Sequence, residues 1–167
     1  RWHARAQMPT SRAHLAVTAW GDRIYAIGGV GDEGVSSKVE VYDPKTDTWA
    51  SRRSKPTPVG FVSAGVIEDR IYVAGGVGTD SQVERVLEVY DPAEDTWEER
   101  SPLPEGVASY GVAVLEGKLY LFSYLEYTGN NFDADMKRMA ADPETQRWWK
   151  ETDPCQLPLP DAGQAIF

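Results

Sequence analysis

The sequence contains little cysteine and no long apolar stretch. Its one cysteine, Cys155, excludes an intrachain disulfide framework and a multi-cysteine zinc site, and it favours a reducing compartment such as the cytoplasm. No run approaches the roughly 18 apolar residues that a membrane-spanning helix requires, and the first ten residues, RWHARAQMPT, lack the apolar core of a signal peptide. We therefore expect no membrane association.

Positive charge is also scarce. Lysine and arginine number 17 against 26 aspartates and glutamates, so the 167-residue chain carries a net charge of −9. A negative surface repels phosphate backbones, whereas it suits basic peptides. We therefore expect a protein or peptide partner and no nucleic acid.

A long repeat runs through the chain. One set of tyrosines recurs at spacings of 47 and 48 residues: Tyr25, Tyr72 and Tyr120. One set of tryptophans recurs at spacings of 47, 48 and 51 residues: Trp2, Trp49, Trp97 and Trp148. Because a period of this length is typical of repeat architectures, it predicts the overall fold before any local assignment is made.

Each unit is predicted to contain four short strands. The first strand is almost wholly apolar, and after a tight turn the second ends in a glycine doublet, as in IYAIGG (24–29) and IYVAGG (71–76). The third strand alternates apolar and charged residues, and an Asp-Pro turn leads to the fourth strand with its tryptophan. FDADMKRMAADPE (132–144) lies where the third unit should have its third strand, so we expect a strand there.

The repeated residues are predicted to serve packing between units. A four-stranded sheet of this size cannot bury both faces alone, whereas copies stacked radially can. Glycine at the end of the second strand permits positive φ or close backbone approach, and the aromatic side chains supply large flat surfaces between sheets.

This combination of a glycine doublet, Tyr-Asp-Pro and Thr-Trp resembles the kelch-repeat family. The first two units match the family pattern at these positions: Tyr25, Gly28, Gly29, Tyr42 and Trp49, then Tyr72, Gly75, Gly76, Tyr90 and Trp97. The third unit keeps Tyr120 and Trp148 but has Ser123 and Tyr124 at the glycine positions and Ala141 at the second tyrosine. The resemblance implies an all-β, kelch-type β-propeller with three four-stranded antiparallel blades.

The predicted blades are 12–51, 60–99 and 108–150. We expect residues 1–5 to form the last strand of a preceding blade and residues 162–167 the first strand of a following one. Propellers typically need 4 to 8 blades to close. The chain is therefore predicted to form a partial propeller, whose ring is closed by further blades of the same chain or by a second chain.

Binding is predicted on the rim that carries the longer loops and the connections between blades, because variable polar loops on a rigid scaffold often carry function. Its candidate polar residues, which could equally be solvated without a partner, are Arg12, Ser36, Ser37, Arg52, Arg53, Ser81 and Arg85. Its candidate aromatic residues, which either form a recognition hot spot or pack within their own loop, are Tyr124, Tyr127 and Phe132.

The resemblance implies a protein-interaction scaffold that presents rim loops to a peptide or protein partner, as a substrate-recognition module of a larger protein does. One alternative is a sugar-active propeller, such as an epimerase of acidic sugars (sialic acids), with Arg12 and Arg85 around the central axis. Another is a purely structural segment.

No cofactor and no metal are expected. Copper-dependent relatives use several imidazoles, whereas this chain has only His3 and His14. Asn131, Asp133 and Asp135 stand at alternate positions, but the glycine turn and distal glutamate of a hand-type calcium loop do not follow them.

Overall fold

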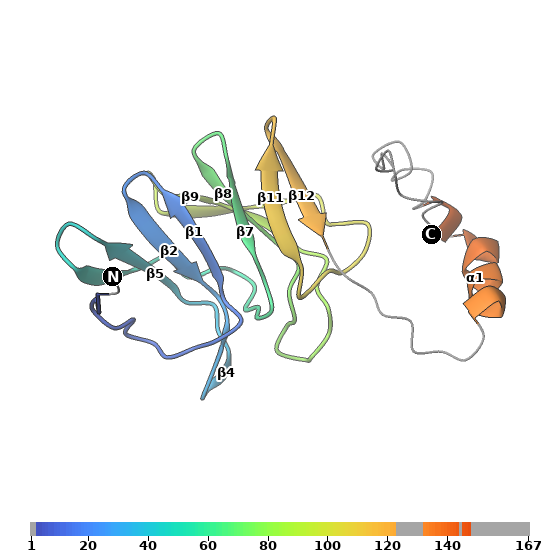
Figure 1. Ribbon diagram of the computed structural model, residues 1–167, viewed down its shortest axis with the longest axis horizontal. Helices are drawn as coiled ribbons and strands as arrows, with labels where there is room; N and C mark the ends of the chain where they lie inside the picture. The colour runs from blue at the N-terminus through green and yellow to red at the C-terminus, as the bar shows by residue number, and fades with distance from the viewer. Residues whose placement is uncertain (1–2, 123–131, 144, 148–167) are drawn as a thin grey trace. The chain divides into compact units, whose positions relative to one another are not determined.

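The computed structural model describes residues 3–122, 132–143 and 145–147 of the chain. Residues 1–124 and 125–167 form two compact bodies, which are considered separately. The N-terminal body is built of β-strands, shown in Figure 1 from blue to yellow, and the C-terminal body contains the helix α1 (Phe132–Ala141). The predicted all-β architecture of four-stranded antiparallel sheets is confirmed.

The first sheet is an antiparallel meander in the order β1-β2-β5-β6. Its strands are β1 (Ala16–Trp20), β2 (Arg23–Ile27), β5 (Val39–Asp43) and β6 (Thr48–Arg52). A small hairpin, β3 (Val30–Gly31) and β4 (Gly34–Val35), lies within the loop between β2 and β5. The fourth strand is therefore at the edge of the sheet farthest from β1.

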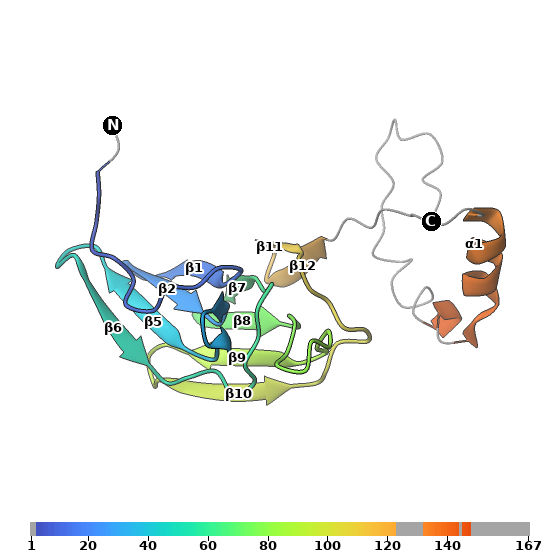
Figure 2. The same cartoon turned by 90° about the horizontal axis from the view of Figure 1, so that it is seen from below.

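The second sheet repeats this design. Its strands, from the inner to the outer edge, are β7 (Ala64–Ile67), β8 (Arg70–Ala74), β9 (Leu87–Asp91) and β10 (Thr96–Arg100). The register is also repeated, because Tyr42 pairs with Trp49 in the first sheet and Tyr90 pairs with Trp97 in the second. Figure 2 shows β6 and β10 on the side of the sheets away from β1 and β7.

A third hairpin consists of β11 (Gly111–Leu115) and β12 (Lys118–Phe122). The strand β7 contacts both β1 and β11, so the first strands of the three units lie side by side (Figure 1). This arrangement, in which equivalent strands face a common side, is the one that radial stacking of blades requires.

The strand expected within 132–144 is wrong, because residues 132–141 form the helix α1. The segment FDADMKRMAA has no β-branched residue and is rich in alanine, methionine, lysine and arginine, which favour helices. The described residues of the third unit thus include two strands rather than four. The expected outer strands at 1–5 and 162–167, and Trp148, fall wholly or partly outside the described residues.

One hydrophobic core joins the first two sheets. Its residues from the first sheet include Tyr25, Ile27, Val39 and Val41, and those from the second sheet and the connection before it include Val59, Ile71, Val73 and Tyr90. The rings of Tyr25 and Tyr90 lie 6.0 Å apart at an angle of 60°. Each sheet therefore covers a face of its neighbour, as the repeat predicts.

Candidate partner-binding rim

The two glycine doublets hold the bases of the rim loops. Gly28 and Gly29 have φ values of 66° and 103°, and Gly75 and Gly76 have values of 60° and 101°, which side chains rarely permit. The second glycine of each doublet donates its N–H to the next connection between blades, at 2.8 Å to Val59 and 2.7 Å to Val107. The predicted need for positive φ and close approach is confirmed at both doublets.

The same backbone bonds brace each loop, although the loop sequences differ. Ser36 and Glu84, 48 residues apart, donate to the second glycine of their doublets at 2.8 Å in both units. Their carbonyls accept from Val59 and Val107, at 3.3 Å in both units. The scaffold thus fixes the base of each loop in the same way, whatever residues occupy its tip.

The repeated tyrosine, aspartate and tryptophan fasten the connections between blades. The Tyr90 hydroxyl donates to Asp95 at 2.5 Å, and Asp95 also accepts the backbone N–H of Arg53 at 2.8 Å. The Trp97 indole donates to the Arg53 carbonyl at 3.0 Å. The first unit makes equivalent bonds, in which Tyr42, Asp47 and Trp49 hold Ala6. These side chains are therefore occupied by the scaffold.

Replacing Tyr90 with phenylalanine is expected to lower the free energy of unfolding by about 1 to 2 kcal/mol, because a partly buried hydrogen bond to a carboxylate is lost. Partial burial would raise the pKa of Asp95, but hydrogen bonds from Tyr90 and from the Arg53 N–H outweigh it and lower the pKa. Ionised Asp95 therefore stabilises the fold above its unfolded pKa of about 4, and this contribution is lost as pH falls through the lower folded value.

Thermal unfolding of the wild type and Tyr90→Phe between neutral and acidic pH measures both effects. The variant should lose less stability on acidification than the wild type. Tyr72→Phe is the matched control, because within the described residues its hydroxyl forms no hydrogen bond. Equal acid sensitivity of Tyr90→Phe and the wild type would contradict the role given to this bond.

A buried ion pair lies below each rim loop. In the first sheet Arg12 contacts Glu40 at 3.0 Å, and Thr10 donates to the same carboxylate at 2.9 Å. In the second sheet Glu88 pairs with Lys55 and accepts from Thr57 at 2.8 Å. Burial lowers the pKa of Lys55, although the Glu88 carboxylate opposes that shift. Equivalent carboxylates thus receive their cations from different positions in the chain.

The FKB95, Kelch-repeats domain model matches residues 3–157 of the sequence. The chain belongs to the kelch-repeat family. In its kelch repeats, the glycine doublets therefore hold the bases of the loops, and the Tyr-Asp-Trp hydrogen bonds hold the connections between blades. The resemblance identified from the sequence is confirmed.

Curated kelch relatives match short segments of the chain. Beta-scruin of Limulus polyphemus is 42% identical over 52 residues, which are 30% of this chain and 6% of scruin. Kelch-like protein 35 of Mus musculus is 40% identical over 50 residues, 29% of this chain and 9% of that protein. A putative F-box/kelch-repeat protein of Arabidopsis thaliana is 40% identical over 48 residues, 29% of this chain and 13% of its own. The chain thus spans a small part of these relatives.

The solved structure of YjhT has the same fold. It superposes with a TM-score of 0.67 at 22% identity, covering 72% of this chain and 47% of that chain. The likeness shows the kelch-type β-propeller fold alone. Among the described residues, no helix is long and apolar enough to cross a membrane. In the same part of the chain, no group of three or more His, Cys, Asp or Glu side chains could hold a metal ion.

Two of the arginines predicted for the kelch rim have internal partners. The Arg12 side chain has no exposed surface, and it contacts Glu40 and the Ala26 carbonyl, each at 3.0 Å. Its guanidinium is therefore enclosed by its own blade and is not presented at the surface. Arg85 is exposed, and its Nε donates to the Leu103 carbonyl at 2.8 Å. The arginine pair on which a sugar pocket would depend is thus engaged within the scaffold.

The other predicted polar residues lie at different depths. Ser36 and Ser37 are half-buried at the base of the first kelch loop, and the Ser36 hydroxyl accepts the Lys38 N–H at 3.1 Å. Arg52, which ends β6, is half-buried, whereas Arg53 and Ser81 are exposed. Tyr124 and Tyr127 lie outside the described residues. Phe132 begins α1, and its side chain is also outside them.

The structure adds loop-tip residues that the sequence prediction did not select. Asp32 and Glu33 are exposed at the tip of the first loop, and Asp80 and Val83 are exposed in the second. Val83 stands out because 49% of an apolar side chain faces solvent there. Two sequence features could have indicated these turns. They are the acidic residues between the two glycines of GDEG (31–34) and the polar run TDSQV (79–83).

Proposed function

We propose that this kelch segment binds a protein or peptide partner through the loops 30–38 and 77–85. The observation that carries the proposal is the equal bracing of two loops with unlike tips. Their bases share the same pattern of backbone bonds, and their exposed tips carry Asp32 and Glu33 in one loop and Asp80 and Val83 in the other. A fixed base with a variable tip is the arrangement used for recognition on rigid scaffolds.

The partner is proposed to present a basic, partly apolar segment. The two loop tips project from the same end of the sheets, at the lower side of Figure 1, while the β7–β8 and β11–β12 turns are at the upper side. Their carboxylates are part of the net charge of −9 of the chain. This negative charge attracts cations and accelerates association with basic peptides. Val83 supplies an apolar contact beside them. Binding should therefore weaken as salt is added.

Charge reversal on the rim tests the proposal. A peptide selected from a phage-displayed library against the wild type is expected to lose at least about tenfold in affinity for the triple variant Asp32→Lys, Glu33→Lys and Asp80→Lys. Isothermal calorimetry measures the loss.

The matched control is Glu68→Lys, Glu94→Lys and Glu116→Lys. These exposed residues lie in turns at the other ends of the strands, and the substitutions change the net charge by the same amount. The control should bind like the wild type. If both triple variants lose affinity equally, the effect is one of net charge and the rim is not the binding surface.

A further inference from the structure

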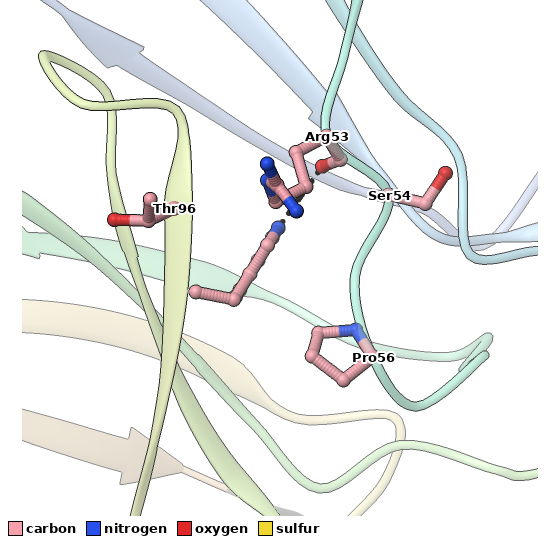
Figure 3. A pocket seen from close by; sticks show the side chains of 5 residues that line it. Arg53, Ser54, Pro56 and Thr96 are labelled. Atoms are coloured by element: carbon pink, nitrogen blue, oxygen red, sulfur yellow. Dashed lines mark hydrogen bonds between the residues drawn. The ribbon is translucent and has the colours of Figure 1, made fainter.

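A hollow of about 370 Å³ lies between the segment that follows β6 and the start of β10. It is lined by Arg53, Ser54, Pro56, Thr96 and Trp97, and we name it the outer hollow. Figure 3 shows the segment that follows β6 on one side and Thr96 of β10 on the other. The outer hollow is formed by β10 and the connection that follows β6, so it is separate from the loop tips at 30–38 and 77–85.

Arg53 is fixed at one edge of the outer hollow. Its backbone N–H donates to the Asp95 carboxylate, and its Nε donates to the Asp95 carbonyl, each at 2.8 Å. Its own carbonyl accepts the Trp97 indole N–H at 3.0 Å, the dashed line in Figure 3. The two terminal amino groups of this exposed guanidinium have no hydrogen-bond or ion-pair partner within the described residues. These two amino groups lie in one plane, and both can donate hydrogen bonds to a single carboxylate.

An apolar wall stands beside that donor edge. Trp97 is half-buried, and its ring lies 4.9 Å from that of Tyr90, which keeps the indole in place. Pro56 is exposed on the connection and cannot rotate its ring away. A planar cation next to a fixed aromatic and aliphatic surface suits a ligand with a carboxylate and an adjacent apolar group.

Charges of both signs lie near the Arg53 guanidinium. The neighbouring Arg52 adds positive charge, which helps to lower the pKa of Asp95. The Asp95 carboxylate already accepts from Tyr90 and from the Arg53 N–H. Glu99 is exposed on β10 two residues beyond Trp97, on the same face of the strand, and opposes an incoming anion from farther along. Arg52 and Arg53 thus attract a carboxylate, whereas Asp95 and Glu99 oppose it and limit its affinity.

We infer that the outer hollow binds an acidic side chain of a partner peptide, with the next apolar side chain of that peptide against Trp97 and Pro56. The volume accommodates two side chains of this kind, since ligand pockets begin at about 300 Å³. The carboxylate accepts from the two terminal amino groups of Arg53 in a forked pair. This site is independent of the loop tips at 30–38 and 77–85, and it selects the opposite charge.

The first unit provides a matched site without the arginine. Counting back by the repeat, Ala6 stands at the position of Arg53, while Pro9 and Trp49 match Pro56 and Trp97. The backbone bonds are the same, because Ala6 donates to Asp47 at 3.0 Å and accepts from Trp49 at 3.0 Å. A ligand that needs only the aromatic wall would use both places, whereas one that needs the guanidinium would use the outer hollow alone.

Nuclear magnetic resonance of the indole N–H groups tests the inference. The probe is an acetylated, amidated peptide with the sequence Gly-Glu-Leu-Gly, and the neutral counterpart has glutamine in place of glutamate. The Trp97 signal, identified with Trp97→Phe, should move saturably with the acidic peptide while the Trp49 signal stays fixed. Arg53→Ala should weaken binding by at least about tenfold, and Arg53→Lys should restore part of it.

Ala6→Arg supplies a test by gain of function, because it should make the Trp49 signal respond to the acidic peptide. An unchanged overall spectrum of each variant shows that it is folded. The inference is overturned if the acidic peptide causes no saturable shift of Trp97, if Trp49 of the wild type responds equally, or if the neutral peptide binds as tightly.

Discussion

Replacing Lys55 with methionine is expected to lower the free energy of unfolding by about 3 to 5 kcal/mol, because the change leaves a buried carboxylate without its cation. The Lys55 side chain has no exposed surface and its Nζ contacts Glu88, whose own side chain is 2% exposed. The same Nζ donates to the Thr57 carbonyl at 3.0 Å, so a second buried acceptor loses its donor. Urea unfolding followed by tryptophan fluorescence measures the loss.

Two further variants make this prediction specific. Removing both charges with Lys55→Met and Glu88→Leu should recover most of the stability, because an apolar pair of similar size has no desolvation cost. Lys45→Met removes an exposed lysine that pairs with the exposed Asp22, and it should change stability little. A Lys55→Met variant as stable as Lys45→Met would contradict the assignment of a buried pair.

Replacing Gly76 with valine is expected to cost about 3 to 5 kcal/mol, as backbone strain and a steric clash add together. Gly76 has φ of 101°, and a Cβ there would lie 2.8 Å from the Val59 Cβ and 2.9 Å from the Gly60 carbonyl oxygen. Neither atom is at the end of a flexible side chain, so the backbone of the connection before β7 would have to shift. Chemical unfolding gives the free energy difference.

Gly34→Val separates the two causes. Gly34 has nearly the same φ, 96°, but an added Cβ would meet no atom within 4 Å. This variant should show the backbone strain alone, about 1 to 3 kcal/mol. If Gly76→Val proves no more destabilising than Gly34→Val, close packing of Val59 and Gly60 against the doublet is disproved.

The repeat made the scaffold predictable from the sequence. Tyrosine, tryptophan and the glycine doublet recur in one phase because each has the same internal partner in each sheet. Tyr90 and Tyr42, for example, each reach an aspartate five residues later at 2.5 Å. A residue whose role depends on partners at a fixed distance in the chain leaves a periodic signal, and that signal can be read without coordinates.

The burial of two glutamates was not predictable by the same argument. Alternation in VEVYD and LEVYD indicates a half-buried strand with its charges outward, yet Glu40 is 3% and Glu88 is 2% exposed. Their cations come from Arg12, two residues after Thr10, and from Lys55, two residues before Thr57. Because Arg12 and Lys55 do not occupy equivalent positions of the repeat, the periodic pattern of the sequence does not indicate the ion pairs.

The arginines show the same limit at the candidate sites. Arg12 and Arg53 look alike in the sequence, each close to a proline in a connection between blades. In the structure the first is enclosed beside Glu40, and the second is exposed with its terminal amino groups directed to the outer hollow. The burial of each arginine side chain depends on which strand its connection packs against, and the sequence alone does not define that packing.

The proposed role of the loops follows from the contrast between repeated residues and loop-tip residues. Repeated side chains are engaged with the scaffold, whereas Asp32, Glu33, Asp80 and Val83 are exposed at the tips. In the third repeat, the helix α1 stands where the third strand was predicted. Recognition by the rim is therefore proposed for residues 30–38 and 77–85 alone.

Hydrogen exchange of the backbone amides, with and without the selected basic peptide, locates the binding surface. If the loops bind the peptide, we expect added protection to be concentrated in residues 30–38 and 77–85, with little change in the turns at 68–69 and 116–117. Protection concentrated in those turns, or spread evenly over the sheets, would contradict a binding surface on the loop rim.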